Sequence, residues 1–462
     1  MLAPLGALVV EGWPAAVGAL LVQEAGLWLA RRLAQQPRWS LVSGLFLAAY
    51  GLRVAIALPT HYVAKLGNGN GALFLDDYTN DLVAEWLGRI ARGEALAIFP
   101  GHQHLLDGLY PYLLMGMYAT LGYAPLVPKL LNAALAGLCV VLVYEIARDV
   151  FRPSVALIAG VVAAVLPSLV VWSVVTLKEP LALLLTLVSL RAVQQLIAAP
   201  AGRTTAPLVT LLAALAVTLD LRSTTAAIVL GVALVGLLGR RGLRTSAWQA
   251  GLGALALVVL VGGGLWTARS WATGRPPLAV VQDVGLQLRH RRAQEAASAR
   301  SQIRDQHEVF SAEGTELPDA EAASDAAPFS VLGDVLDPLG YALLAPAPWQ
   351  VHSLRELAAS GEMPMWYALL AGALLAWRNQ PRQRLFVGCL LLYGVASWLV
   401  LAASEGNLGN LLRHRMMLTP TLLVLGAAGL DWLWAQAIQV WPRLPLVQRA
   451  RVGLGRALVG DS

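Results

Sequence analysis

Apolar runs of about 20 residues, separated by short polar breaks, recur along this chain and restrict it to one kind of architecture. A helix of that length crosses the hydrocarbon core of a bilayer with all its backbone polar groups paired internally. Hydrophobic residues make up 57% of the 462 residues and charged residues only 13%, which is more apolar surface than a soluble domain can bury. Runs such as residues 130–143 do not alternate as membrane β-strands do. The sequence therefore predicts an all-α polytopic membrane protein.

The apolar runs predict about ten spans, within a range of roughly nine to twelve, and the arginines between them indicate the threading. If the residues before Trp39 are cytoplasmic, most of the arginines fall in inner connections and few cations fall in the short outer ones. This bias follows the positive-inside rule. The predicted spans start near Trp39, Lys129, Ser154, Pro180, Thr205, Ser223, Trp248, Met363, Arg384 and Met416.

Two long loops are predicted on the non-cytoplasmic side of the membrane. In the first loop, the apolar and aromatic stretch from Leu109 to Tyr123 is too short for a span and is expected to be a helix lying in the outer interface. The predicted parts are an N-terminal interfacial helix or extra span (1–38), an N-terminal transmembrane module (39–268) that includes the first outer loop (59–124), a second outer loop (269–362), a C-terminal transmembrane module (363–438) and a cytoplasmic tail (439–462).

The acidic cluster in the first outer loop is the strongest candidate for chemistry. Asp76 and Asp77 are adjacent, and Asp81 follows one helical turn later at the start of a helical pattern. Adjacent carboxylates cannot share one face of a helix, so one is expected to cap the helix while the other points into a cleft. Plain capping in a solvated loop is one interpretation. The other is a general base, or a carboxylate pair that binds a divalent cation.

Cations and further carboxylates lie at the predicted outer ends of several spans. Lys178 and Glu179 begin one span, where the lysine either extends to headgroups or binds a phosphate. Asp220 and Arg222 join two short spans, either as a structural ion pair or as the floor of a polar funnel.

The last span is preceded by a second cluster of charges. Glu405 comes before Arg413, His414 and Arg415, and arginines at an outer boundary call for an anionic partner, either phosphate or anionic lipid. His102 and His104 form a lone His-x-His pair, for which no complete set of zinc ligands is evident.

The net charge, the cysteines and the absence of standard catalytic motifs exclude several classes of protein. The net charge of +6 is not accompanied by a basic and aromatic patch for nucleic acid, so anionic lipid headgroups are the expected partner. Cys139 and Cys389 lie inside apolar runs and predict neither a disulfide nor a metal site. The standard catalytic motifs, including Gly-rich phosphate loops, HExxH and GxSxG, do not occur. An enzyme with this sequence would build its site from the outer loops.

Short motifs between about residues 70 and 200 resemble one family. In order, they are Asp76-Asp77, Leu109-Tyr110-Pro111-Tyr112, Lys129-Leu130-Leu131-Asn132-Ala133, Tyr144-Glu145-Ile146-Ala147-Arg148, Leu166-Pro167-Ser168, Trp172-Ser173 and Lys178-Glu179. The stretch resembles the polyprenyl-phosphate-dependent GT-C glycosyltransferases, which include protein O-mannosyltransferases and lipid A aminoarabinose transferases. The ending, Gly406-Asn407 followed by Arg413-His414-Arg415, resembles members encoded with bacterial surface polysaccharides. The acidic pair is Asp-Asp here, whereas Asp-Glu is common in the family.

The resemblance implies a GT-C-like enzyme of the bacterial inner membrane with its active site facing the periplasm. Asp77 or Asp76 would act as base on an acceptor hydroxyl, and Lys178, Arg222, Arg413 and Arg415 would stabilise the departing phosphate. Further substrate contacts are expected at Asp81, His102, His104, Glu179 and His414. The donor would be a polyprenyl-phosphate-linked sugar and the acceptor a lipid-linked glycan or a protein. No cofactor is predicted beyond a possible divalent cation at Asp76 and Asp77.

The sequence also leaves two other functions open. One is a polysaccharide polymerase or flippase, which would belong to the transport class. The other is a non-catalytic membrane scaffold whose second outer loop, residues 269–362, binds a partner.

Overall fold

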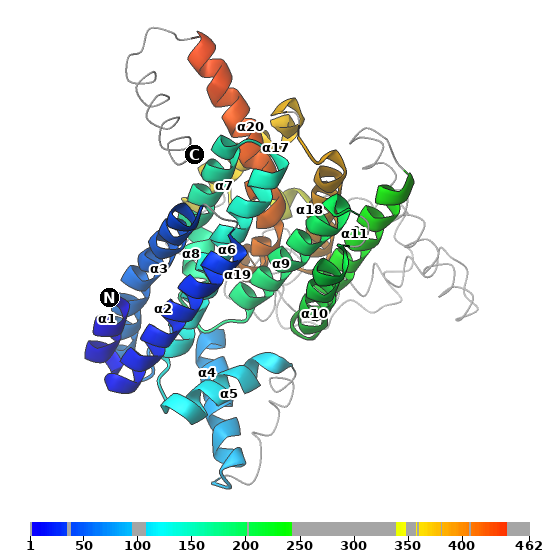
Figure 1. Cartoon of the computed structure of the whole chain (residues 1–462). Coiled ribbons are helices and arrows are strands. Elements are labelled where there is room, and N and C mark those ends of the chain that lie inside the picture. The colour runs from blue at the N-terminus through cyan, green and yellow to red at the C-terminus, as the bar shows by residue number, and fades with distance from the viewer. Residues whose placement is uncertain are drawn as a thin grey trace, which may run out of the picture. The chain divides into compact units, whose positions relative to one another are not determined.

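The structure is a computed structural model that describes residues 2–34, 38–94, 108–200, 203–242, 339–347, 357, 360–379, 381–405 and 408–440. These residues form helices and no strand, as the apolar runs predicted (Figure 1). The chain divides into two compact units, each described by itself below. Unit 1 comprises Met1–Ala227, Ala368–Gln383 and Leu422–Ser462, and unit 2 comprises Ile228–Tyr367 and Arg384–Thr421.

Six helical stretches among the described residues are long and apolar enough to cross a membrane. They are α3 (Trp39–Asn68), α6 (Leu126–Val150), α9 (Glu179–Ala198), α11 (Ser223–Gly242), α18 (Arg384–Ser404) and the stretch Leu408–Ile438, which comprises α19 (Leu408–His414), η5 (Arg415–Leu418) and most of α20 (Thr419–Val440). The chain is therefore an all-α membrane protein. The predicted count of about ten spans is not confirmed.

The other predicted spans correspond to shorter helices. The helices α7 (Pro153–Val165), α10 (Thr205–Leu221) and α17 (Met363–Leu375) begin at or beside predicted starts but have only 13, 17 and 13 residues. The helix α7 ends before Pro167, because the residue before a proline is disfavoured in the helical conformation, and a short helix, α8 (Pro167–Val171), follows. The span predicted near Trp248 lies outside the described residues.

The N-terminal residues form two helices, α1 (Leu2–Glu11) and α2 (Trp13–Leu33), which are separated at Gly12. Both pack against α3 (Figure 1). The helix α2 is not among the six membrane-length apolar helices, so the choice between an interfacial helix and an extra span stays a prediction. The helix α3 passes through Pro59 and ends at Asn68, so the chain stays helical for nine residues beyond the predicted start of the first outer loop at residue 59.

The central helix of unit 1 is α6, which packs against α2, α3, α7 and α9. Small residues let these helices approach closely. A side chain added at Gly26 of α2 or at Gly137 of α6 would meet the ring of Phe46, which is fully buried on α3. Elsewhere in unit 1, the backbones of α17 and α20 touch where Gly372 faces Gly429. These four glycines therefore allow close helix packing.

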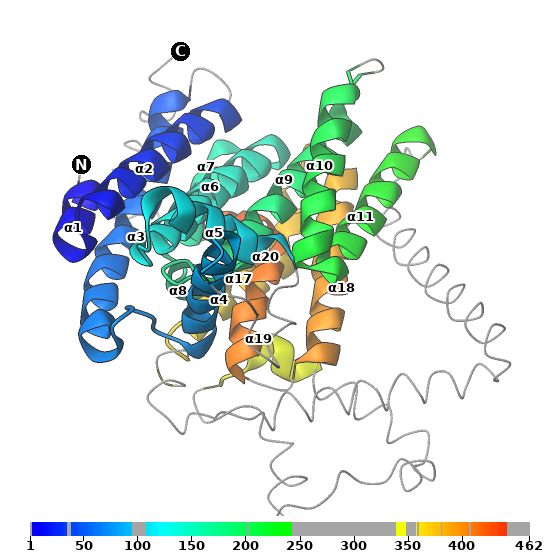
Figure 2. The ribbon, with the colours of Figure 1, turned by 90° about the horizontal axis from the view of Figure 1, so that it is seen from below.

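Two helices of the segment predicted to be the first outer loop, α4 (Leu75–Ala91) and α5 (Leu109–Leu121), pack against each other beyond one end of α3 and α6 (Figures 1 and 2). Their shared core is aromatic and includes Tyr110, Leu114 and Tyr118, which pack with Ala84 of α4 and Leu221 of α10. The expected helix at 109–123 is therefore formed, with 13 residues. This α4–α5 pair carries the acidic cluster.

Candidate functional site

Asp77 lies in the first turn of α4, and its side chain is completely buried. Its Oδ2 accepts hydrogen bonds from the backbone N–H of Leu73 (2.9 Å) and from the ammonium group of Lys129 on α6 (3.1 Å). Its Oδ1 accepts one from the N–H of Thr176 (2.8 Å), in the segment between α8 and α9. A carboxylate is also favoured at a helix N-terminus, where the helix dipole is positive. Asp77 therefore joins three parts of unit 1 through one carboxylate.

Lys129 is the partner that makes this burial possible. Only 1% of the lysine is exposed, and its Nζ also donates to the carbonyl oxygen of Gly71 at 2.6 Å. A buried charge is tolerated when it is both paired and hydrogen-bonded, and the two side chains meet this condition for each other. Gly71 has a left-handed backbone (φ 79°), and its missing side chain makes room for the imidazole of His61.

Asp76, the neighbour of Asp77, is exposed. The expected division between the two adjacent carboxylates is therefore present, with Asp77 pointing inward and Asp76 outward. The N-cap residue of α4 is Phe74, whose side chain forms no capping hydrogen bond. The two carboxylates differ in what they can do. Asp77 is held by three donors, and Asp76 is accessible to a substrate.

Asp81 lies one helical turn after Asp77, on the same face of α4, and is also completely buried. Its Oδ1 accepts a hydrogen bond from the hydroxyl of Tyr118 on α5 at 2.5 Å. Burial, and next the negative charge of Asp77, raise the pKa of Asp81 to about 8, so this carboxyl is neutral at pH 7. The Oδ2 atom hydrogen-bonds to no described residue, although the Thr176 hydroxyl is near enough to lower the pKa slightly.

The segment that precedes α9 is fastened to this site by two amide side chains. Asn132 of α6 donates to the carbonyl oxygens of Val175 (2.6 Å) and Leu177 (2.8 Å), and Asn80 of α4 donates to that of Thr176 (2.8 Å). These bonds hold the segment against the start of α4. Lys178, the last residue of the segment, is exposed.

The charged residues predicted at the outer ends of α9 and α10 have different partners from those expected. Arg222 forms an ion pair with the buried Glu179 at 3.0 Å, and Asp220 accepts a hydrogen bond from the backbone N–H of Leu109 at 2.6 Å. Asp220 and Arg222 therefore do not form the ion pair that was one interpretation of their spacing. Glu179 and Arg222 instead tie the start of α9 to the end of α10.

In unit 2, Arg415 is buried and donates to the carbonyl oxygens of Tyr341 (3.4 Å), Ala342 (3.1 Å) and Ala345 (2.6 Å). Its guanidinium lies 5.1 Å from the ring centroid of Trp366. These contacts favour a structural role over the predicted phosphate-binding role. His414 contacts Glu405 at 2.6 Å, and Arg413 is half-buried.

Some predictions concern residues that the structure does not describe. His102 and His104 lie outside the described residues. Among the described residues, no group of three or more histidine, cysteine, aspartate or glutamate side chains is arranged to hold a metal ion. The carboxylates Asp76 and Asp77 point in different directions, which does not favour a cation shared between them.

The sequence did not predict the contacts of Lys129 and Asn132, which were noted only in a motif of the family resemblance and at the start of an apolar run. The available signal was a charged and an amide side chain three residues apart, hence on one face at the start of the α6 span. It also missed Arg53, which is buried within α3 and donates to the hydroxyl of Ser173 at 2.9 Å. Ionisable residues inside a span indicate polar surroundings in the folded protein.

Comparison of the sequence with protein-family models and with curated proteins gave no match.

Proposed function

We propose that this protein is a membrane glycosyltransferase that moves a sugar from a polyprenyl-phosphate donor to a lipid-linked glycan or protein acceptor on the non-cytoplasmic face. The observation that carries the proposal is the arrangement at the start of α4, where an exposed carboxylate, Asp76, stands beside Asp77, which is held by Lys129 and two backbone N–H groups. A carboxylate fixed on a rigid turn is suited to take a proton from a bound hydroxyl.

In the proposed reaction, Asp76 accepts the proton of the acceptor hydroxyl while that oxygen attacks the anomeric carbon of the sugar. The bond from the anomeric carbon to the phosphate oxygen breaks, and the phosphate leaves with the bonding electrons. Lys178 is an exposed cation at the end of the segment whose Thr176 N–H donates to Asp77. It would stabilise the negative charge on the leaving phosphate. Asp77 acts as a positioning residue, because its buried oxygens are occupied by donors of the protein.

The direct test is transfer of a labelled sugar by the purified protein from a polyprenyl-phosphate donor. The Asp76→Asn variant is expected to lose about 10²- to 10⁴-fold in kcat, the usual contribution of a general base, with KM little changed. The control is Glu94→Gln, which alters another exposed carboxylate near the far end of α4. Full activity of the Asp76→Asn variant would show that Asp76 is not the general base.

A vesicle assay separates this function from transport. If reconstituted protein moved the lipid-linked sugar across the bilayer and left the sugar–phosphate bond intact, the flippase alternative would replace the transferase. The expected result is sugar transfer with release of the polyprenyl phosphate.

A further inference from the structure

The helix α2 carries two polar side chains in the middle of an apolar sequence. Residues 14–30 of this helix are apolar except for Gln23 and Glu24. Glu24 is exposed and Gln23 is half-buried. Among the described residues, the carboxylate of Glu24 accepts a hydrogen bond only from the amide of Gln23, its neighbour in sequence, at 3.3 Å. The remaining polar atoms of the pair are therefore available to a partner.

The contacts of α2 indicate the depth of this pair. The helix has 21 residues and is about 31 Å long at a rise of about 1.5 Å per residue. A side chain added at Gly18 would meet Val127 in the first turn of α6. One added at Gly26 would meet the ring of Phe46, which also lies against the middle of α6. Glu24 is therefore level with a part of α6 between its first turn and its middle.

Glu24 lies on the face of α2 that points away from the rest of unit 1. The buried residues of α2 are small and form the face toward α3 and α6: Ala15, Gly18, Ala19, Gly26 and Ala30. The opposite face, called here the outward face, consists of Leu20, Leu21, Glu24 and Trp28, which are all exposed. Figures 1 and 2 show α2 at the outside of its helix cluster. One carboxylate is thus surrounded by large apolar side chains.

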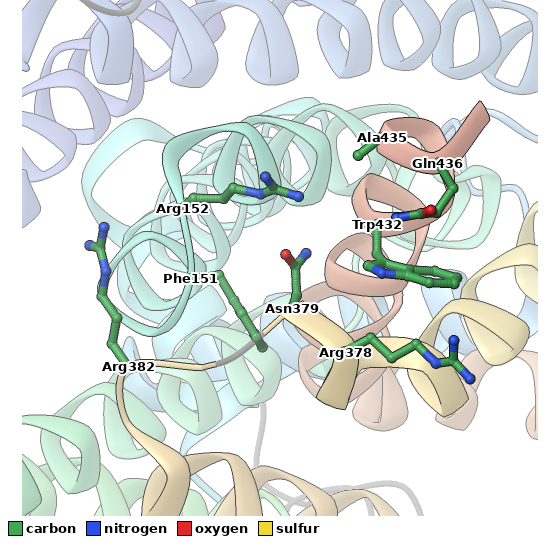
Figure 3. Close-up of a pocket in the computed structure, with 8 residues that line it drawn as sticks. All are labelled: Phe151, Arg152, Arg378, Asn379, Arg382, Trp432, Ala435 and Gln436. Carbon is green, nitrogen blue, oxygen red and sulfur yellow. The ribbon is translucent and has the colours of Figure 1, made fainter. Parts of the chain in front are cut away.

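Other charged side chains of unit 1 find their partners within the unit. Arg53, buried in α3, donates to the hydroxyl of Ser173 at 2.9 Å. Beyond the last residue of α6, Figure 3 shows Arg152 extended across an open cavity of about 440 Å³ toward α20, where Asp431 accepts its hydrogen bond at 2.6 Å. An ionisable group exposed to hydrocarbon is costly, so such groups normally face a partner. For Glu24, this partner lies outside the described part of unit 1.

We infer that α2 spans the membrane and that its outward face is the contact between two copies of this chain. Both copies insert in the same direction, so the two-fold axis of their dimer runs along the membrane normal. Residues of the same number then lie at the same depth. Glu24 of one copy therefore meets Gln23 and Glu24 of the other.

A second copy supplies what the outward face lacks. Gln23 offers amide N–H donors and Glu24 offers carboxyl acceptors, so the pair is complementary to itself across a two-fold axis, and each hydrogen bond occurs twice. Hydrogen bonds between side chains of neighbouring helices stabilise association in a membrane. Leu20, Leu21 and Trp28 surround the pair and exclude lipid from it. This contact is independent of the proposed glycosyltransferase activity.

The first test is oxidative cross-linking of the full-length protein in its native membrane. In a Cys139→Ala/Cys389→Ala background, Leu21→Cys is expected to give a disulfide-linked dimer of twice the mass, because the two cysteines face each other across the axis. The matched control is Leu212→Cys on α10. Leu212 is exposed to 56% and Leu21 to 58%, so both cysteines are equally accessible to chance collisions. The control is expected to give no dimer.

The second test keeps the native cysteines and measures sedimentation equilibrium of the purified protein in a density-matched detergent. Glu24→Leu is expected to raise the dissociation constant of the dimer at least about tenfold, because hydrogen bonds across the contact are lost. Glu24→Gln retains an acceptor and adds donors, and it is expected to stay within about threefold of wild type. Leu212→Ala is expected to leave the constant unchanged.

Four outcomes would overturn the dimer contact. They are a wild-type protein that is monomeric in both tests, equal cross-linking of Leu21→Cys and Leu212→Cys, a cross-link from Leu21→Cys to a different protein, and an unchanged dissociation constant in Glu24→Leu. If the cysteine-free background does not fold, the sedimentation series decides alone, since it uses the native cysteines.

Discussion

Replacing Lys129 with methionine removes one partner of the buried ion pair at the start of α4 and retains most of the side-chain volume. In the folded protein, Asp77 would keep the N–H groups of Leu73 and Thr176 but lose the only cation within 4 Å among the described residues. Both members of the pair are at most 1% exposed, so water cannot replace the lysine without rearrangement.

The expected cost is about 3–5 kcal/mol of unfolding free energy, the usual effect of leaving one charge of a buried pair without its partner. The ratio of folded to unfolded protein would fall by about 10²- to 4 × 10³-fold, since about 1.4 kcal/mol corresponds to a factor of ten. Adding Asp77→Asn to Lys129→Met removes the uncompensated charge, and part of the stability is expected to return as a coupling energy of about 0.5–3 kcal/mol.

The assay is unfolding of the purified protein by a denaturing detergent in mixed micelles, followed by tryptophan fluorescence. Lys178→Met is the matched control, because Lys178 is an exposed lysine and a surface substitution changes stability by about 0.5 kcal/mol or less. Equal small effects for both lysine variants, or strict additivity of Lys129→Met and Asp77→Asn, would refute the ion-pair reasoning.

Three further predictions concern pH, backbone conformation and sidedness. The pKa of Asp81 in the folded protein, about 8, lies above the usual value of about 3.9, so between these pH values the folded protein retains a proton that the unfolded chain releases. The free energy of unfolding should therefore fall as pH rises through this window, by up to about 1.4 kcal/mol per pH unit. In the Asp81→Asn variant, the free energy of unfolding should depend less steeply on pH. If denaturation curves of this variant show the same pH dependence as wild type, the assignment of the shift to Asp81 is contradicted. Gly69→Ala and Gly71→Ala both place a side chain at positive φ, which costs about 1–2 kcal/mol. Only the side chain of Gly71→Ala also meets the buried imidazole of His61, so this variant should have the lower melting temperature. Equal melting temperatures would argue against that contact. In intact cells, a membrane-impermeant maleimide should label Asp76→Cys and not Arg203→Cys, because the predicted threading puts these two residues on opposite membrane faces. The two native cysteines are buried and should add little background labelling. Labelling of both variants would contradict the threading.

Helix positions were predictable where an apolar run alone decides the structure. The starts of α3, α9 and α18 lie within one residue of the predictions at 39, 180 and 384. The end of α3 was not predictable in this way, since Pro59 was expected to begin the loop. Proline is tolerated inside a membrane helix when its neighbours satisfy the displaced backbone groups, and α3 continues nine residues beyond it.

The acidic cluster was predicted, but its partners were not. Asp77 and Lys129 are 52 residues apart, and the sequence does not indicate that the face of α6 with Lys129 and Asn132 meets α4. One interpretation of Asp220 and Arg222 was an ion pair, because the two residues are close in sequence. Residues two apart at the end of a helix point in different directions, and each found a partner on another segment.

The pair of Asp77 and Lys129 also bears on how the chain enters the bilayer during synthesis. The segment that carries Asp77 precedes α6, so the carboxylate is synthesised before the lysine. Lys129 is in the first turn of its span, where a side chain can reach the headgroups until its partner is met. Thr176 emerges later still, so the third bond to Asp77 forms only once the segment before α9 has been made. The three hydrogen bonds to Asp77 can therefore all be present only after the chain has been synthesised as far as Thr176.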